Sequence, residues 1–210
     1  MEVSSGAALS TLGRPKCLNK GVMDTFGIPA PLSRLVEATC GDHAERVGLL
    51  AARTAFLLNL DVELALIAGY LHDVGKVTVC PGVLDKPGPL TLLERQVMQQ
   101  HAVCGAQLVQ EGWPAAPVEV VTAVLRHHER LDGQGYPDGQ TRLEPLSAVV
   151  AVADIYDALT QPRVYRPWVL SGPELVQALF AQALPREPLL ALCSLVGLRL
   201  PKERTHLQVG

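Results

Sequence analysis

Apolar residues recur at helical spacing along most of the chain from residue 32 onward. Val47, Leu50 and Ala51, for example, are three and four positions apart and therefore share one face of a helix. We expect helices near 42–58, 61–73, 91–112, 114–128, 145–160, 171–183 and 187–196. Alternating runs of β-branched residues, which are typical of strands, are missing from the sequence. The pattern predicts an all-α fold.

Polar residues and glycines mark the boundaries of these elements. Thr91 with Glu94 three residues later is the signature of a capping box, which starts a helix. Gly75 is expected to end the helix before the first long loop. The two longest predicted loops cover 77–90 and 129–144, and the second is dense in glycine. Long structured loops in compact domains are commonly functional.

The length and apolar content fit a single domain. The chain has 210 residues, of which 48% are hydrophobic, which suffices for one sizeable core. The predicted organisation is an irregular leader over 1–31, one compact helical bundle over 32–200 and a short tail over 201–210. The apolar stretch Leu189–Leu200 is expected to pack on the core, with a homodimer contact as the alternative.

Charge and cysteine usage exclude several classes of function. The formal net charge of −3 lacks the basic balance of domains that bind duplex nucleic acid. The five cysteines are scattered and include no CxxC pair, which indicates a reduced protein without a disulfide framework. No uncharged apolar segment approaches the roughly 18 residues of a membrane span. We therefore expect a cytoplasmic protein that binds neither a membrane nor duplex nucleic acid.

Histidine and carboxylate residues form the strongest chemical signal. Five of the six histidines and two aspartates form one set of candidate metal ligands: His43, His72, Asp73, His101, His127, His128 and Asp154. Such ligands suit iron, manganese or zinc, and two of these ions can polarise a phosphoryl oxygen and generate hydroxide near neutral pH. The set indicates a metal-dependent phosphohydrolase with its metal centre between helices.

The spacing of the ligands indicates how they share the ions. His72 and Asp73 are adjacent, and neighbours on a helix point about 100° apart, so the pair can reach two ions if Asp73 bridges them. His127 and His128 either hold one ion together or divide between two. Asp154 interrupts a long apolar run, and a buried carboxylate is normally paired or bound to metal.

Three further polar residues lie close to these ligands in the sequence. Arg46 follows His43 by three residues, and Lys76 follows Asp73 by three, so each shares a helix face with a candidate ligand. Both cations can bind phosphate oxygens of a substrate. Glu129 either assists proton transfer or has a structural role at the end of a helix.

Three motifs around these residues are similar to those of a known family. They are His-Asp-Val-Gly-Lys at 72–76, His-His-Glu at 127–129 and Asp-Gly-Gln-Gly-Tyr-Pro-Asp-Gly at 132–139. Together they resemble the signature of the HD-GYP phosphodiesterases, a bacterial branch of the HD-domain metal-dependent phosphohydrolases. The similarity extends from about His43 to Arg166.

The resemblance implies an all-helical domain that hydrolyses cyclic di-GMP to the linear dinucleotide or onward to GMP. By this resemblance, the seven candidate ligands of this chain would hold the metal ions, with Asp73 as the bridging and catalytic carboxylate. Lys76 would lie near the scissile phosphate, as both a catalytic and a substrate-binding residue. Gly135, Tyr136 and Pro137 would flank the substrate pocket and offer a surface to partner proteins.

Departures from the family pattern refine this expectation. Members with three metals carry a glutamate four residues before the first histidine ligand, where this chain has Thr39, so we expect two divalent ions, iron or manganese. Gln140 and the segment 161–166 also differ from the usual residues, which affects substrate fit more than metal binding. We expect no receiver or sensor domain in these 210 residues, so that any regulator, such as a diguanylate cyclase or a separate sensor, would act in trans.

Two other functions fit the same residues. One is an HD-type phosphohydrolase that acts on a mononucleotide, another cyclic dinucleotide or a phosphorylated metabolite. The other is a catalytically weak module that senses cyclic di-GMP or docks a partner protein. Turnover of cyclic di-GMP, compared with that of other nucleotides, separates these possibilities.

Overall fold

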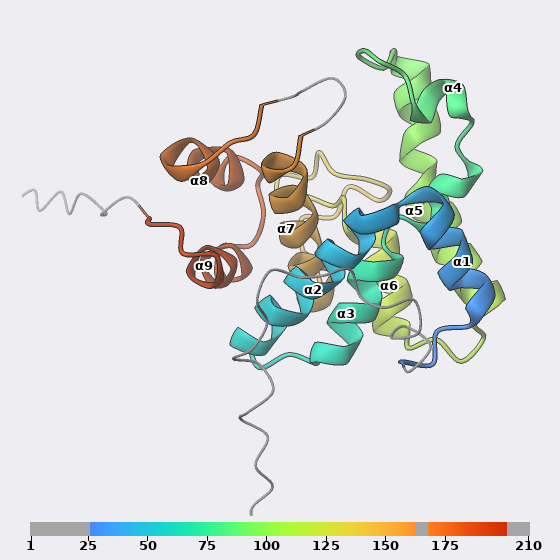
Figure 1. Cartoon of the computed structure of the whole chain (residues 1–210), viewed down its shortest axis with the longest axis horizontal. Helices are drawn as coiled ribbons and strands as arrows, with labels where there is room; N and C mark the ends of the chain where they lie inside the picture. Colours follow the sequence, from blue (N-terminus) through green and yellow to red (C-terminus); the bar gives the residue numbers. More distant parts are fainter. Residues whose placement is uncertain (1–25, 163–167, 201–210) are drawn as a thin grey trace, which may run out of the picture.

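The computed structural model describes residues 26–162 and 168–200, and this part of the chain consists of helices and loops without a strand (Figure 1). The elements are α1 (Ala30–Thr39), α2 (Gly41–Leu57), α3 (Val62–Leu71), the 3-10 helix η2 (Val74–Thr78), α4 (Pro81–Leu84), α5 (Leu92–Gly112), α6 (Val118–Arg126), α7 (Pro145–Thr160), α8 (Gly172–Phe180) and α9 (Arg186–Leu195). The predicted all-α fold is confirmed. Most of the predicted leader and the whole predicted tail lie outside the described residues.

Helix α3 forms the centre of the larger core. The Asp61 carboxylate caps its first turn by accepting the backbone N–H of Leu64 at 2.9 Å, and every residue of its last two turns is buried. A helix that is apolar all round is stable only when it is covered on all sides, and α2, α6 and α7 pack around it. A Cβ on Gly69 would lie 2.8 Å from the Cα of Gly48, so glycine is needed for the close contact between α3 and α2.

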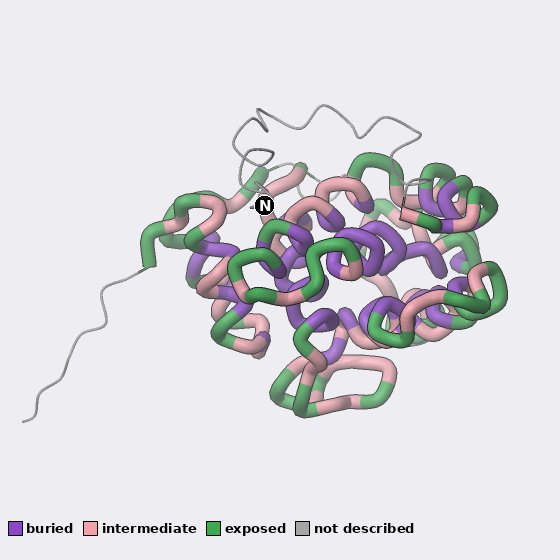
Figure 2. The backbone as a smooth tube through the Cα atoms, turned by 90° about the horizontal axis from the view of Figure 1, so that it is seen from below, coloured by how far each residue is buried: buried purple, intermediate pink, exposed green. Residues whose placement is uncertain are grey.

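Helix α7 joins this core to a second, smaller one. Nearly all of its residues from Leu146 to Ile155 are buried. One side of it packs in the larger core and the other faces α8 and α9, where Leu179, Leu189 and Leu192 are buried. The expectation that the apolar stretch Leu189–Leu200 packs on the core is confirmed for Leu189 and Leu192. Figure 2 shows the buried segments gathered inside the bundle and the exposed ones around it.

Helix α5 is the longest helix and extends away from the bundle beside α4 (Figure 1). It begins at the predicted capping box, in which Thr91 and Glu94 each accept the other's backbone N–H. Its first turn exposes Leu92 and Leu93, whereas its middle part buries His101 against η2 and α6. The capping box thus starts the helix that carries one of the candidate metal ligands into the core.

One helix and one boundary differ clearly from the predictions. Helix α1 was not among the predicted helices, and the chain turns between it and α2 at Gly41, whose φ of +50° is readily adopted by glycine. Helix α6 begins at Val118 rather than near 114, since Pro117 disfavours helical geometry in the residue before it. The first predicted loop, 77–90, also contains the end of η2 and the short helix α4.

Gly75 has a different role from the predicted helix terminator. Helix α3 ends before it, and Gly75 lies inside η2. A Cβ at this position would come within 2.0 Å of the His101 carbonyl oxygen and 2.5 Å of the Gly105 nitrogen. The glycine therefore permits η2 and α5 to pack backbone against backbone, which brings Asp73 close to His101.

Over the described part of the chain, no helix is both long and apolar enough to cross a bilayer.

Candidate metal centre

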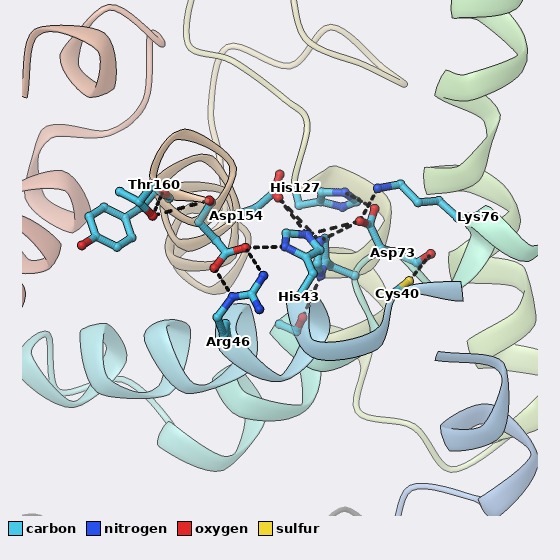
Figure 3. Close-up of polar contacts among 12 residues, drawn as sticks. Cys40, His43, Arg46, Asp73, Lys76, His127, Asp154 and Thr160 are labelled. Carbon is cyan, nitrogen blue, oxygen red and sulfur yellow. Dashed lines mark hydrogen bonds and ion pairs between the residues drawn. The ribbon is translucent and has the colours of Figure 1, made fainter. Parts of the chain in front are cut away.

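The candidate ligands come from five segments of the chain, in or directly after helices, and converge on one point in the bundle. They lie near the start of α2, after the end of α3, in the middle of α5, after the end of α6 and in α7. Figure 3 shows His43, His127 and Asp154 pointing toward Asp73 from different elements. The structure brings together all seven residues that the sequence predicted as ligands, whereas metal binding by them remains a prediction.

Asp73 divides the histidines into two groups. Its Oδ1 lies 3.2 Å from Nε2 of His101 and 3.9 Å from Nε2 of His127. Its Oδ2 lies 3.5 Å from Nε2 of His43 and 3.2 Å from Nε2 of His72. Two sets of ligand atoms, each close enough to hold one ion, therefore share this carboxylate. Such an arrangement is typical of a carboxylate that bridges two metal ions.

Asp154 and His128 complete the two groups on opposite sides of Asp73. Oδ1 of Asp154 lies 3.3 Å from Nε2 of His43 and 3.7 Å from Nε2 of His72. His128 has a ligand atom near those of Asp73, His101 and His127. The geometry therefore favours His127 and His128 sharing one position, which was one of the two alternatives left open by the sequence.

Three histidines are oriented by backbone carbonyls of their own helices. Nδ1 of His72, His101 and His127 each lies 2.7 to 2.8 Å from the backbone carbonyl oxygen three residues earlier. A carbonyl can only accept, so Nδ1 carries the hydrogen and Nε2 is free to bind a metal. Nε2 of His72 is buried and has no hydrogen-bond partner in the described structure. A buried polar atom without a partner is costly, and a metal ion would satisfy it.

His43 is held by a carboxylate that the sequence analysis did not single out. Nδ1 of His43 lies 2.7 Å from Oδ2 of Asp157. Arg46 donates two hydrogen bonds to the same carboxylate, from Nε at 2.6 Å and Nη2 at 3.0 Å. Asp157 is buried and follows Asp154 by three residues on an otherwise apolar helix, which was the available signal. A carboxylate behind a metal-binding histidine fixes the ring and raises its basicity.

The carboxylates of the cluster favour a positive charge on two of its histidines. Burial alone lowers the pKa of His43, but three neighbouring carboxylates outweigh burial and raise it to about 11. Burial acts in the same direction on His72, yet the neighbouring carboxylates of Asp73 and Asp154 raise its pKa to about 9. Both histidines therefore hold protons at positions that a metal ion can take.

The carboxylates of the cluster remain ionised. Burial favours the neutral acid, but the charges of His72 and Lys76 hold the pKa of Asp73 well below its usual range. The neighbouring His43 and His72 have the same effect on the pKa of Asp154 despite its burial. Two buried carboxylates that stay charged require compensating cations.

His127 and His128 are held neutral. Burial and then the charges of nearby His72 and His101 lower the pKa of His127 to about 3. Burial keeps the pKa of His128 well below its usual range. Neutral imidazole is the form that binds metal. The donor types, their orientation and their charges thus fit a pair of divalent metal ions.

A pocket of about 780 Å³ opens beside the cluster. Its lining combines metal-site residues with an apolar loop: Lys76, Val83, Leu84, Lys86, Pro87, Gly88, Pro89, Leu90, Met98, His101, His128 and Tyr136. Lys76 also donates to Oδ2 of Asp73. Burial would lower the pKa of Lys76, but the Asp73 carboxylate outweighs burial and raises it. A positive charge therefore lies where the pocket meets the cluster.

Tyr136 of the glycine-rich loop lines the pocket next to His128. Both carboxylate oxygens of the buried Glu129 accept backbone N–H groups of the loop, from Asp138 at 2.7 Å and Gln140 at 2.8 Å. The Tyr136 ring stacks on His128 with a centroid distance of 4.6 Å. Of the two roles considered for Glu129, this geometry favours the structural one.

The predicted substrate-binding residues have different positions. Lys76 and Tyr136 line the pocket, whereas Arg46, Gly135 and Pro137 are not among its lining residues. Gly135 packs so tightly against Glu129 that a Cβ would lie 2.5 Å from the Cα of that residue. Arg46 uses its guanidinium on Asp157, so a contact of Arg46 with substrate remains only a prediction from sequence.

Comparison with known proteins agrees with the site geometry. The family model described as "HD domain" matches residues 30–173 of this chain. The matched range begins with α1 and includes all seven candidate ligands.

Three named relatives are 34% to 41% identical to this chain over the aligned residues. The chain is 40% identical over 151 residues to the cyclic di-GMP phosphodiesterase response regulator RpfG of Xanthomonas campestris, covering 67% of this chain and 40% of that protein. It is 41% identical over 171 residues to the cyclic di-GMP phosphodiesterase PA4108 of Pseudomonas aeruginosa, covering 77% and 41%. It is 34% identical over 163 residues to the 3'3'-cGAMP-specific phosphodiesterase 2 of Vibrio cholerae, covering 72% and 30%. The chain thus spans less than half the length of these relatives.

Solved structures show the same fold. The HD domain of phosphodiesterase PgpH from L. monocytogenes, in complex with cyclic-di-AMP, superposes with a TM-score of 0.60 at 15% identity, covering 81% of this chain and 99% of that one. Bd1817, an HD-GYP-type protein from Bdellovibrio bacteriovorus, gives a TM-score of 0.59 at 21% identity, covering 74% and 51%. The resemblance inferred from the sequence motifs is confirmed, and the chain belongs to the HD domain family.

Proposed function

We propose that this protein is a metal-dependent phosphodiesterase that hydrolyses cyclic di-GMP. The observation that carries the proposal is the buried Asp73 carboxylate, whose two oxygens face two groups of histidines beside a pocket with a positively charged wall. The named relatives, which are cyclic di-GMP and 3'3'-cGAMP phosphodiesterases, support the substrate class.

The metal centre would be held by the seven candidate ligands. His43, His72 and Asp154 would bind one ion, His101, His127 and His128 would bind the other, and Asp73 would contact both. Two divalent ions bound there would polarise a phosphoryl oxygen and supply hydroxide near neutral pH.

The other residues of the site would bind the substrate or hold neighbouring site residues in place. Lys76 would donate to an oxygen of the scissile phosphate and offset the negative charge that develops there. Asp157 would hold His43 in position, and Glu129 would keep the loop that carries Tyr136 against His128.

We further propose that the centre holds two ions, iron or manganese. Position 39 is a threonine, so it offers no carboxylate to a third ion. Its hydroxyl donates instead to the Leu35 carbonyl within its own helix at 2.8 Å. Nitrogen and carboxylate ligands suit both metals.

A cytoplasmic location is supported by the cysteines of the described segments, all of which are free thiols.

The first product would be the linear dinucleotide, with further cleavage to GMP as a second step. A second candidate substrate is 3'3'-cGAMP, because the chain is 34% identical to a phosphodiesterase specific for it. The two cyclic dinucleotides share the same phosphodiester backbone and differ in one purine.

Product analysis tests the proposal. Protein purified and metal-loaded without oxygen is incubated with cyclic di-GMP, 3'3'-cGAMP and a mononucleotide, and the products are separated by chromatography. We expect the linear dinucleotide from cyclic di-GMP and its loss in Asp73→Asn. Intact cyclic dinucleotides with a fully metal-loaded sample would contradict the proposed activity and favour a binding module.

A further inference from the structure

The pocket extends well beyond the metal ligands along one face of α5. His101 and Met98 line it, and Glu94 lies four residues before Met98, so the three share one helix face. Glu94 lies seven positions before His101, which corresponds to about 10 Å along the helix axis, and Lys86, which pairs with Glu94, lines the pocket. The pocket therefore reaches from His101 toward the start of α5 and is long enough to face more than a single phosphoryl group.

A second lysine lies at the Glu94 end of this wall. Nζ of Lys86, which lines the pocket, is 2.6 Å from Oε2 of Glu94. The same carboxylate oxygen accepts the backbone N–H of Thr91 at 2.7 Å, so the pair is anchored to the start of α5. The hydrogen bond from Lys86, followed by that from the Thr91 backbone, lowers the pKa of Glu94 to about 2. Glu94 is therefore ionised and holds the ammonium in place.

The Lys86 ammonium retains donors for a ligand. An ammonium group has three N–H donors, and the pair with Glu94 uses one of them. The Lys86 side chain is 29% exposed, so its head group is accessible from the pocket. Lys76 and Lys86 thus place one positive charge near the metal cluster and one near the start of α5.

The wall near Lys86 is apolar. Val83, Leu84, Pro87 and Leu90 line this part of the pocket. Apolar side chains and proline rings provide surfaces against which flat, weakly hydrated purine rings can pack. Two separated cations with an apolar surface beside them match a molecule that carries two phosphates and two bases.

We propose that Lys86 binds the second, non-scissile phosphate of a cyclic dinucleotide while the scissile phosphate lies at Asp73 and Lys76. This inference rests on the proposed function and adds a specificity-determining residue to it. Lys86 distinguishes dinucleotides from small phosphodiesters, which have no second phosphate to offer. Because the second phosphate does not react, Lys86 binds substrate and transition state equally and acts on KM rather than on kcat.

Two substrates and three variants test the inference. Metal-loaded wild-type protein, Lys86→Met, Lys86→Arg and the control Arg95→Gln are compared on cyclic di-GMP and on bis-p-nitrophenyl phosphate, a diester with one phosphate. Arg95 is an exposed cation on α5 outside the pocket lining, so its variant removes the same charge from the same region.

The expected result is specific to the dinucleotide. Loss of a charged hydrogen bond raises KM for cyclic di-GMP about tenfold or more in Lys86→Met, with kcat nearly unchanged. Lys86→Arg restores most of the affinity, and Arg95→Gln behaves as wild type. Turnover of bis-p-nitrophenyl phosphate is the same in all four proteins.

Two results would overturn the inference. One is an unchanged KM for cyclic di-GMP in Lys86→Met, and the other is an equal loss on both substrates, which indicates a structural effect. If wild-type protein leaves cyclic di-GMP intact, the proposed function fails, and equilibrium binding of cyclic di-GMP then tests Lys86 by itself. Weaker binding by Lys86→Met would support the second phosphate position, whereas equal binding, or none by wild type, would reject it.

Discussion

At the scale of single residues, the site depends on side chains that hold the metal ligands in place. Asp157 is the clearest case, because it contacts His43 while Arg46 holds it with two hydrogen bonds. None of these contacts requires a bound metal. The orientation of His43 is therefore set by the protein in advance.

Replacement of Asp157 by asparagine should weaken metal binding without unfolding the protein. We expect a 10- to 100-fold lower affinity, which is typical for the loss of a carboxylate behind a metal-binding histidine. Competition with a chromophoric chelator measures the affinity of each variant. The control is Asp85→Asn, an exposed aspartate outside the site. Equal affinities for wild type and Asp157→Asn would show that this carboxylate does not support the centre.

Metal affinity should rise with pH. The pKa of His43 is raised to about 11 and that of His72 to about 9, so both are protonated at neutral pH and a metal must displace their protons. Increasing pH removes this competition, which strengthens binding up to about tenfold per pH unit for each displaced proton. Calorimetric titration at pH 6 to 9 in buffers of different ionisation enthalpy counts the released protons. Affinity that is independent of pH would contradict the assignment of these histidines.

At the scale of elements, the close contact between η2 and α5 determines the distance between the two groups of ligands. The backbone of Gly75 touches that of His101 and Gly105. Asp73 lies just before this contact and His101 lies at it. A change in the spacing of these elements moves the bridging carboxylate relative to His101.

Replacement of Gly75 by alanine should therefore affect both stability and the metal centre. A Cβ would meet the His101 carbonyl oxygen at 2.0 Å, and overpacking of this kind costs about 1–3 kcal/mol or more. Urea unfolding measures the stability, and chelator competition measures the metal affinity. Gly82→Ala is the matched control, since a Cβ there has no atom within 4 Å. Wild-type behaviour of Gly75→Ala would refute the role assigned to the contact.

Local signals in the sequence were sufficient for most elements. The capping box of Thr91 and Glu94 predicted the start of α5, and the apolar periodicity predicted α2, α3 and α7 close to their observed positions. Helix α1 was not predicted, because its 10 residues are too few for their apolar periodicity to be distinguished from the irregular sequence before them.

The site shows the same division between local and long-range information. The seven candidate ligands could be named from their residue types and spacing, since histidines and carboxylates in apolar helices are unusual. The roles of Asp157 and Gly75 were missed, because each depends on a contact with a distant segment of the chain. Arg46 was assigned to substrate from its spacing, whereas the structure places it against Asp157.

At the scale of the whole molecule, the candidate metal centre joins helices from different parts of the bundle. Its candidate ligands belong to α2, α5 and α7 and to the segments after α3 and α6. Metal ions bound there would link these elements and offset the charge of two buried carboxylates. The centre should therefore contribute to the stability of the fold as well as to catalysis.

Removal of the metal should lower the melting temperature. A ligand present at 1,000 times its Kd stabilises the folded state by about 4 kcal/mol, which corresponds to about 10 °C for a domain of this size. Thermal unfolding with and without a strong chelator measures the shift. Asp73→Asn provides the comparison, because without the bridging carboxylate the chelator should have little effect. A chelator shift of equal size in both proteins would place the bound metal elsewhere.

The most direct test of the central claim is the metal content of the protein purified without oxygen, measured by elemental analysis for wild type and for Asp73→Asn. A centre bridged by Asp73 predicts about two iron or manganese ions per chain in wild type and fewer than one in the variant. Wild-type protein that binds no metal, or a variant that retains both ions, would contradict the account.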